Sequence, residues 1–378
     1  MHPVFTGCSP NMPQDGRAPL SFQEQAEAVT TDLAHAREAP DTLRAASPLG
    51  REVRTGQGLR CADVLDLELD RQLDRELDPA TRRAKIYAHR GSSGLFPEHS
   101  RAAYQRALEE GADGLEIDLH LTADGEPVCF HDATVDRTSN GTGAVAELSL
   151  QQMRSLDVTS WKTPRLPGEY GRRQDQLMTL ADVLELLTEA GRDLSLAIEL
   201  KHPSPFGDRL ETKVLRTLLR FGWDPETSVI PAGGADKYAV TVSFMSFYPG
   251  SLLYLADMVA PDKLCALLSR VTEAQVQKRL HGVPLAFAVR PLVAAVMRGT
   301  LRDSEALVWN GRAGIAGPGI TYVRDHRAQV KAWLARGSRL RVWTVDDPQD
   351  AGFLLDLGVQ EITTNYPARL LDAVTLRP

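Results

Sequence analysis

Cysteine is scarce in this sequence, and the few cysteines lie far apart. The 378 residues contain four of them, Cys8, Cys61, Cys129 and Cys265, and no two form a Cys-x-x-Cys pair. This spacing predicts neither a zinc cluster nor a disulfide framework. We therefore expect the protein to work in a reducing compartment, the cytoplasm.

Long apolar runs and an excess of positive charge are also missing. No stretch approaches the roughly 18 consecutive apolar residues of a membrane-spanning helix, so no transmembrane segment is expected. Lys and Arg number 43 against 50 Asp and Glu, a net charge of −7, which argues against nucleic acid as a partner. Thr6-Gly7-Cys8 resembles a lipoprotein cleavage site. Because no basic start and apolar run precede it, we interpret the match as coincidental.

What the sequence does have is the composition of a globular protein, with 43% apolar and 25% charged residues. We expect residues 1–83 to form an N-terminal extension that is partly disordered, because its early part is rich in Pro, Gly, Ser, Ala and charge. Leu65, Leu69, Leu73 and Leu77 recur at helical spacing. They predict one amphipathic helix that packs on the base of the main domain, with a homodimer contact as the alternative.

Residues 84–378 alternate short β-like runs with amphipathic helices and form the predicted catalytic domain. Eight candidate strands in this alternation favour a closed TIM (β/α)8 barrel, with an open doubly wound sheet as the alternative. Residues 132–178 break the rhythm with Gly, Pro and basic residues and predict a small insertion after the third strand, overhanging the site. The predicted strands are Lys85–His89, Gly114–Leu121, Pro127–His131, Leu194–Leu200, Val240–Met245, Leu264–Leu268, Ala306–Val308 and Arg341–Val345. The predicted helices include Ser100–Glu110, Leu180–Ala190, Arg209–Phe221, Arg324–Arg336 and Pro348–Leu357.

Carboxylates gather on two of these strands. Glu116, Asp118 and His120 alternate with apolar residues, so they share one face of a strand while the apolar face packs against the outer helices. Glu199 and Lys201 repeat this pattern on a later strand. Buried charge is costly unless it is compensated, and three carboxylates without thiolates suit a hard divalent cation, Mg²⁺, Ca²⁺ or Mn²⁺. An exposed edge strand with one polar face is the alternative for the first pattern.

Histidines end two other predicted strands. His89-Arg90 follows the first strand and His131 follows the third, and the catalytic side chains of a barrel gather at this edge. A packed structural histidine is the alternative for each. Arg90 and Lys201 would place fixed positive charge beside the predicted cation, a combination suited to a phosphate group.

The order and spacing of these motifs are specific when they are taken together. The segments concerned are Ala88–Gly91, Glu116–Gly125, Phe130–Asp132, Ile198–Lys201, Val342–Val345 and Ile362–Pro367. In this order they resemble the glycerophosphodiester phosphodiesterase family over residues 84–373. The first 80 residues have no counterpart in the resemblance.

The resemblance implies a TIM barrel that hydrolyses small glycerophosphodiesters to sn-glycerol 3-phosphate and an alcohol. It also implies a role for each candidate residue: Glu116, Asp118 and Glu199 bind one divalent cation, His89 and His131 are the acid/base pair, Arg90 and Lys201 hold the phosphate, Trp343 lines the glycerol pocket, and Glu98 braces the groups around it. Of the two histidines, we favour His89 as the base and His131 as the acid.

Two segments depart from the family pattern. Pro97-Glu98-His99-Ser100 stands where the family usually has Pro-Glu-Asn-Thr, and Thr364-Asn365-Tyr366-Pro367 stands where it often has Thr-Asp-x-Pro. Neither departure removes an implied metal ligand or histidine. Both would tune the hydrogen bonds around the site or the fit of the substrate.

The sequence leaves two mechanistic routes and two other functions open. The glycerol 2-hydroxyl attacks phosphorus and gives a cyclic phosphate that water then opens, or water attacks directly. A lysophospholipase D would need an apolar groove, for which Phe247, Tyr248, Leu252, Leu253 and Tyr254 are candidates, although we favour a core helix as the explanation for these residues. A catalytically silent phosphate-binding barrel predicts a lost ligand or histidine, and none is missing.

Overall fold

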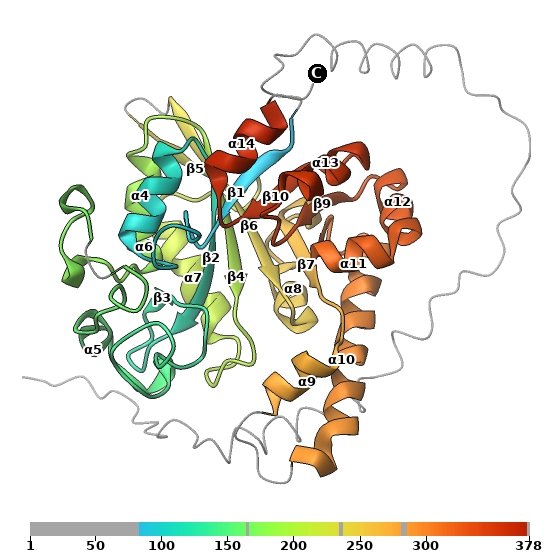
Figure 1. Ribbon diagram of the computed structural model, residues 1–378, viewed down its shortest axis with the longest axis horizontal. Helices are drawn as coiled ribbons and strands as arrows, with labels where there is room; N and C mark the ends of the chain where they lie inside the picture. Colours follow the sequence, from blue (N-terminus) through green and yellow to red (C-terminus); the bar gives the residue numbers. More distant parts are fainter. Residues whose placement is uncertain (1–82, 164–165, 234–236, 281–285, 376–378) are drawn as a thin grey trace, which may run out of the picture. The chain divides into compact units, whose positions relative to one another are not determined.

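A computed structural model describes residues 83–163, 166–233, 237–280 and 286–375 (Figure 1). The predicted N-terminal extension, its amphipathic helix and the Thr6-Gly7-Cys8 motif therefore lie outside the described residues. Within the described ranges, no helix combines the length and the apolar character that crossing a membrane requires.

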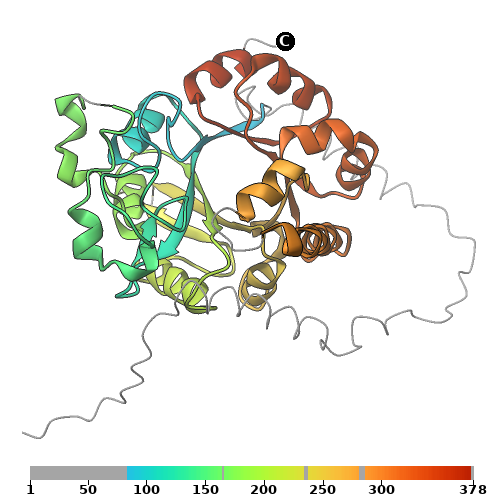
Figure 2. The same ribbon diagram turned by 60° about the horizontal axis from the view of Figure 1, so that its bottom comes forward.

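Eight parallel strands close into a barrel with helices around it (Figures 1 and 2). Neighbouring strands pair in chain order, and β1 pairs with both β2 and β10, which closes the ring. The predicted TIM (β/α)8 barrel is confirmed. Its strands are β1 (Lys85–His89), β2 (Gly114–Leu121), β4 (Leu194–Leu200), β6 (Tyr238–Ser246), β7 (Leu264–Leu268), β8 (Ile315–Pro318), β9 (Arg339–Val342) and β10 (Glu361–Thr364).

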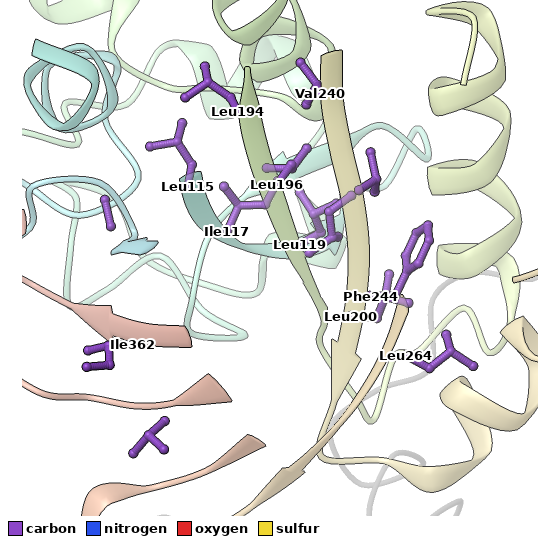
Figure 3. Packing of buried hydrophobic residues seen from close by; sticks show 14 of the residues in the cluster. Leu115, Ile117, Leu119, Leu194, Leu196, Leu200, Val240, Phe244, Leu264 and Ile362 are labelled. Carbon is purple, nitrogen blue, oxygen red and sulfur yellow. The ribbon is translucent and has the colours of Figure 1, made fainter. Parts of the chain in front are cut away.

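The alternation in β2 directs the acidic side chains into the barrel. Leu115, Ile117 and Leu119 are fully buried in the core between the strands and the outer helices (Figure 3). Glu116 and Asp118 lie on the opposite face, because successive side chains of a strand point to opposite sides. The predicted orientation of β2 is therefore confirmed, and the exposed edge strand is excluded.

The helices cover the barrel with their apolar faces. Ser100 and Thr179 begin two of them, each accepting a hydrogen bond from a backbone N–H of the first turn, a stabilising cap. The α-helices are α4 (Arg101–Glu109), α5 (Leu150–Arg154), α6 (Leu180–Thr188), α7 (Arg209–Arg220), α8 (Pro249–Leu255), α9 (Glu273–Arg279), α10 (Ala286–Trp309), α11 (Ile320–Asp325), α12 (Arg327–Ala335), α13 (Pro348–Asp356) and α14 (Pro367–Thr375). Short 3₁₀ helices are η2 (Val145–Glu147), η3 (Gly168–Tyr170), η4 (Arg173–Asp175) and η5 (Pro261–Lys263).

Two further strands pair with the barrel without joining its ring. β3 (Pro127–Cys129) runs antiparallel to β2, and β5 (Val229–Ala232) runs antiparallel to β6. The segment predicted as an insertion follows β3 and packs around its own small apolar cluster, which includes Phe130, Val145 and Met153. The third predicted strand therefore exists, but it is a hairpin partner of β2 rather than a member of the barrel.

Two predicted elements are wrong. Ala306–Val308 is not a strand, because it lies in the last turns of α10, where Leu307 and Val308 are buried on one helical face. A short apolar run does not by itself distinguish a strand from a buried helix. The predicted helix Arg324–Arg336 is two helices, since α11 ends and α12 begins at His326. The strands β8 and β10 were not predicted, although β9, which is equally short, was.

Candidate active site

The neighbouring strands β2 and β4 bring three acidic side chains together. Glu116, Asp118 and Glu199 each place a carboxylate oxygen within 4.8 Å of the others, and all three residues are buried. The register explains this meeting, because Asp118 lies beside Glu199 in the β2–β4 pair and His89 lies beside Glu116 in the β1–β2 pair. The cluster consists of the three carboxylates that the alternating pattern of the two strands predicted.

Asp118 lies at the centre of this cluster. Its Oδ1 is 2.9 Å from Lys201 Nζ and its Oδ2 is 3.1 Å from Arg90 Nε. Burial opposes ionisation, but Lys201 and Arg90 outweigh it and hold the pKa of Asp118 well below its usual value. Burial and the charge of Asp118 raise the pKa of Glu116 well above normal. Burial also raises the pKa of Glu199 to about 7, despite its contact with Lys201.

This donor set fits a hard divalent cation. Lys201 approaches Asp118 Oδ1 as an ion pair, yet that buried oxygen accepts no hydrogen bond of good geometry. Burial, and after it the charge of Asp118, raises the pKa values of Glu116 and Glu199, and the three carboxylates face two side-chain cations, Arg90 and Lys201. Oxygen ligands without thiolates are those that Mg²⁺, Ca²⁺ and Mn²⁺ prefer. The cluster could therefore hold such a cation.

His89 is oriented by a neutral partner. Its Nδ1 lies 2.7 Å from Asn365 Oδ1, which also accepts a hydrogen bond of 2.8 Å from Ser93 Oγ. Asn365 Nδ2 donates to Asp346, so the orientation of the amide is fixed. Since an amide oxygen only accepts, Nδ1 carries the proton and Nε2 of a neutral His89 keeps its lone pair. Burial and the adjacent Arg90 lower the pKa of His89 to about 3.

His131 is oriented by a carboxylate instead. It follows β3, and its Nδ1 lies 2.6 Å from Asp132 Oδ1. Arg137 Nε donates to the other oxygen of Asp132 at 2.5 Å. Burial lowers the pKa of His131 below its usual value, although the hydrogen bond to Asp132 opposes this shift. The two predicted histidines thus face one charged cluster with different partners.

Strained backbone accompanies the phosphate-binding candidates. Arg90 has a φ of 58° and His99 a φ of 60°, values that cost energy for residues other than glycine and are found at functional sites. Between them, Gly91 has no room for a side chain, because a Cβ would lie 2.6 Å from the backbone of Ala103. Glu98 accepts hydrogen bonds of 3.0 Å from Arg90 and 2.7 Å from Arg137, so it contacts two of the basic groups at the site.

His99 was not predicted as a site residue, although its departure from the family pattern pointed to it. Its Nε2 lies 2.9 Å from Asp118 Oδ2, and its Nδ1 lies 2.7 Å from the hydroxyl of Tyr104. Because the carboxylate only accepts, Nε2 donates to Asp118 and Nδ1 accepts from Tyr104. Asn365 was likewise visible only as a departure from the family pattern, and no sequence pattern signals its contact with Asp346.

Trp343 lies where β9 ends. Its Nε1 donates to Gly317 O at 2.7 Å, and its ring meets that of Phe247 edge-on at 5.5 Å. The other candidates for an apolar groove differ in burial. Leu252 is buried and Tyr254 packs against the same core, as the core-helix alternative predicted, whereas Tyr248 and Leu253 are exposed.

Known proteins resemble this chain in sequence. A sequence model of the glycerophosphoryl diester phosphodiesterase family matches residues 89–369. The "Probable glycerophosphodiester phosphodiesterase 1" of Mycobacterium tuberculosis is 32% identical over 289 residues, which cover 75% of this chain and 90% of that protein. A glycerophosphodiester phosphodiesterase of Caldanaerobacter subterraneus is 27% identical, over 76% of this chain and 97% of that protein.

Solved structures share the fold. A phosphodiesterase of Oleispira antarctica, solved in complex with sn-glycerol-3-phosphate as product, superposes with a TM-score of 0.56 at 22% identity, over 78% of this chain and 98% of that one. A second structure, from Silicibacter pomeroyi, superposes with the same TM-score at 20% identity, over 78% of this chain and 93% of that one. The chain therefore belongs to the glycerophosphoryl diester phosphodiesterase family, and the enzyme class that its motifs predicted is confirmed.

Proposed function

We propose that this enzyme hydrolyses glycerophosphodiesters to sn-glycerol 3-phosphate and an alcohol with the help of one divalent cation. One observation carries the proposal: two histidines, each with its Nδ1 held by a partner, border a buried carboxylate cluster flanked by Arg90 and Lys201. The product bound to the Oleispira antarctica phosphodiesterase supports sn-glycerol 3-phosphate as the product here as well.

Charge neutralisation is the first requirement, because a phosphodiester anion repels nucleophiles. Glu116, Asp118 and Glu199 would hold the cation, which when bound neutralises charge on the phosphate oxygens. Arg90 and Lys201 lie within 3.1 Å of Asp118 and would bind phosphate oxygens from the same side. Trp343 would line the part of the site that receives the glycerol.

Proton transfer is the second requirement. His89 is neutral and offers Nε2, so it would take the proton of the glycerol 2-hydroxyl as that oxygen attacks phosphorus. His131 has a carboxylate behind its Nδ1, which favours the imidazolium, and it would give a proton to the departing alcohol. Water then opens the cyclic phosphate with the two roles exchanged. Direct attack by water would use the same two side chains.

His99 would act as a positioning residue. Its hydrogen bond from Nε2 fixes the plane of the Asp118 carboxylate, and the Tyr104 hydroxyl fixes the His99 ring in turn. Such outer partners orient the ligands of metal sites and keep them ready for the ion.

The test is product release from a panel of glycerophosphodiesters with different alcohols, with and without a chelator. We expect sn-glycerol 3-phosphate from at least one member, loss of activity with chelator, and recovery with added Mg²⁺, Ca²⁺ or Mn²⁺. Turnover that survives the chelator would overturn the role of the cation. Phosphorus NMR during turnover separates the two routes, because only attack by the 2-hydroxyl produces a cyclic phosphate.

A further inference from the structure

Exposed apolar side chains concentrate on one side of the described structure. Nine large apolar residues are exposed in the described part of the chain, and five of them lie on segments that leave the barrel at the carboxyl ends of its strands. We call these five residues the rim. They are Leu95 (53% exposed) after β1, Trp161 (39%) in the segment after β3, Tyr248 (45%) after β6, and Val289 (36%) and Leu292 (49%) near the start of α10.

Two parts of the rim lie on loops beside the proposed active site. Leu95 lies in the loop between Arg90 and Glu98, both of which contact the site. Lys162 donates a hydrogen bond to the backbone oxygen of Ser93, which ties the segment containing Trp161 to this loop. Substrate that enters the barrel from its carboxyl edge would therefore pass these side chains.

Helix α10 contributes an apolar face that the barrel leaves uncovered. Its last turns pack on the barrel through Leu307 and Val308, but between Ala288 and Asp303 no residue is buried. Its 24 residues span about 36 Å, roughly twice the length of the five-residue strand β7 before it. Figure 1 shows α9 and the first half of α10 beyond the ends of the strands. The apolar residues of this half include Val289, Leu292, Val293, Val296 and Met297.

Basic residues flank this apolar half in the sequence. From Thr272 to Arg302 the sequence contains one acidic residue, Glu273, which pairs with Arg290. The basic residues of the same stretch are Lys278, Arg279, Arg290, Arg298 and Arg302. An apolar helical face with Lys and Arg beside it is typical of segments that lie in the surface of an anionic membrane.

We propose that the rim docks on a phospholipid surface that carries anionic headgroups, with the active site facing that surface. A second copy of the chain fits less well, because a symmetric contact would bring the same arginines of both copies together.

The experiment uses the full chain and vesicles of phosphatidylcholine alone or with one third phosphatidylglycerol. We expect sedimentation with the anionic vesicles and at least about tenfold weaker binding to the neutral ones, because several Lys and Arg contribute at the surface. The rim variant is Val289→Glu with Leu292→Glu, which should reduce binding to the anionic vesicles by about tenfold or more. The control is Leu219→Glu with Met258→Glu, two residues of similar exposure at the opposite edge, which should bind as the unmodified chain does.

The outcomes separate the proposals. A wild-type chain that stays in solution with anionic vesicles, or a control that loses binding as the rim variant does, overturns the docking surface. Self-association that the rim variant abolishes, without any vesicle binding, assigns the patch to a second copy and also overturns it. Water-soluble glycerophosphodiesters report on the reaction independently, and the rim variant should hydrolyse them at the wild-type rate. If the protein binds the anionic vesicles but hydrolyses no glycerophosphodiester of the panel, the proposed function is rejected and the docking surface is supported.

Discussion

Two charged clusters lie inside the same barrel, and they are built differently. Toward the amino ends of the strands, Arg341 Nε lies 2.6 Å from Glu361 Oε2, and Arg341 Nη2 donates to Ser243 at 3.0 Å. The Arg341 guanidinium also lies over the ring of Tyr87, 4.3 Å from its centroid. Arg341 is 1% exposed and Glu361 is 3% exposed, so each of these buried charges has its partner within the protein.

The cluster of Glu116, Asp118, Glu199, Arg90 and Lys201 lies at the carboxyl edge, and we call it the upper cluster; the Arg341–Glu361 cluster is the lower cluster. The two clusters differ in their balance of charge. Glu116, Asp118 and Glu199 outnumber Arg90 and Lys201, and the pKa values of Glu116 and Glu199 are raised. Burial of charge is therefore common to both clusters and does not distinguish the proposed active site. The excess of carboxylates over side-chain cations distinguishes it, because only this cluster of the two has acidic groups left over that could bind a cation. Substitutions in the upper cluster should impair catalysis, and those in the lower cluster should impair stability.

The largest effect is expected from the histidines beside the upper cluster. His89→Ala and His131→Ala should each lower kcat by about 10² to 10⁴, the usual contribution of a general acid or base. The exposed His326, between α11 and α12, provides the control, and His326→Ala should leave kcat unchanged. Steady-state rates on a soluble glycerophosphodiester give the answer. Near-wild-type turnover by His131→Ala would remove that residue from the mechanism.

The lower cluster should respond in stability. Arg341→Met leaves the carboxylate of Glu361 buried without its main partner, which should lower the free energy of unfolding by about 3 to 5 kcal/mol. The double variant Arg341→Met with Glu361→Gln removes the unpaired charge and should recover part of this loss. Urea denaturation followed by circular dichroism measures both. An Arg341→Met protein as stable as the wild type would show that the lower cluster does not need its pairing.

A divalent cation should stabilise only a complete upper cluster. At a concentration 100 times its Kd, the ion should raise the free energy of unfolding of the wild type by about 2.7 kcal/mol. Glu116→Gln should lose this gain, while its ion-free form should be no less stable than the wild type, because a repulsive carboxylate has been removed. Thermal unfolding with Mg²⁺, Ca²⁺ or Mn²⁺ provides the measurement. An equal gain in Glu116→Gln would place the ion elsewhere.

The smallest effect concerns the support of Asp118. His99→Ala should weaken binding of Mn²⁺ by about 10- to 100-fold, as is typical for a lost outer partner of a metal ligand. His99→Asn restores a donor of the family type and should recover part of the affinity. Tyr104→Phe keeps the ring and loses only the hydroxyl, so its effect should be smaller. Calorimetric titration with Mn²⁺ compares all three, and unchanged affinity in a folded His99→Ala protein would exclude the positioning role.

The sequence was most informative where the pattern is local. The positions of Glu116 and Asp118 followed from the two-residue period of β2, whose apolar half is buried. The same method failed for Ala306–Val308, because three apolar residues fit a strand and a buried helical face equally well. Contacts between distant segments could not be predicted either. Tyr104 and His99 are five residues apart, yet their bond depends on the left-handed backbone of His99, which no periodicity reveals.

The bond between His89 and Asn365 joins residues 276 positions apart in the chain. Asn365 follows β10, the last strand of the barrel, and β10 pairs with β1, which ends at His89. The tautomer of the first histidine is thus selected by nearly the last residues of the domain to leave the ribosome. If His89 is the base that we propose, a nascent or truncated chain that lacks β10 would carry this residue without the partner that selects its tautomer, so the base would be prepared only when the ring closes.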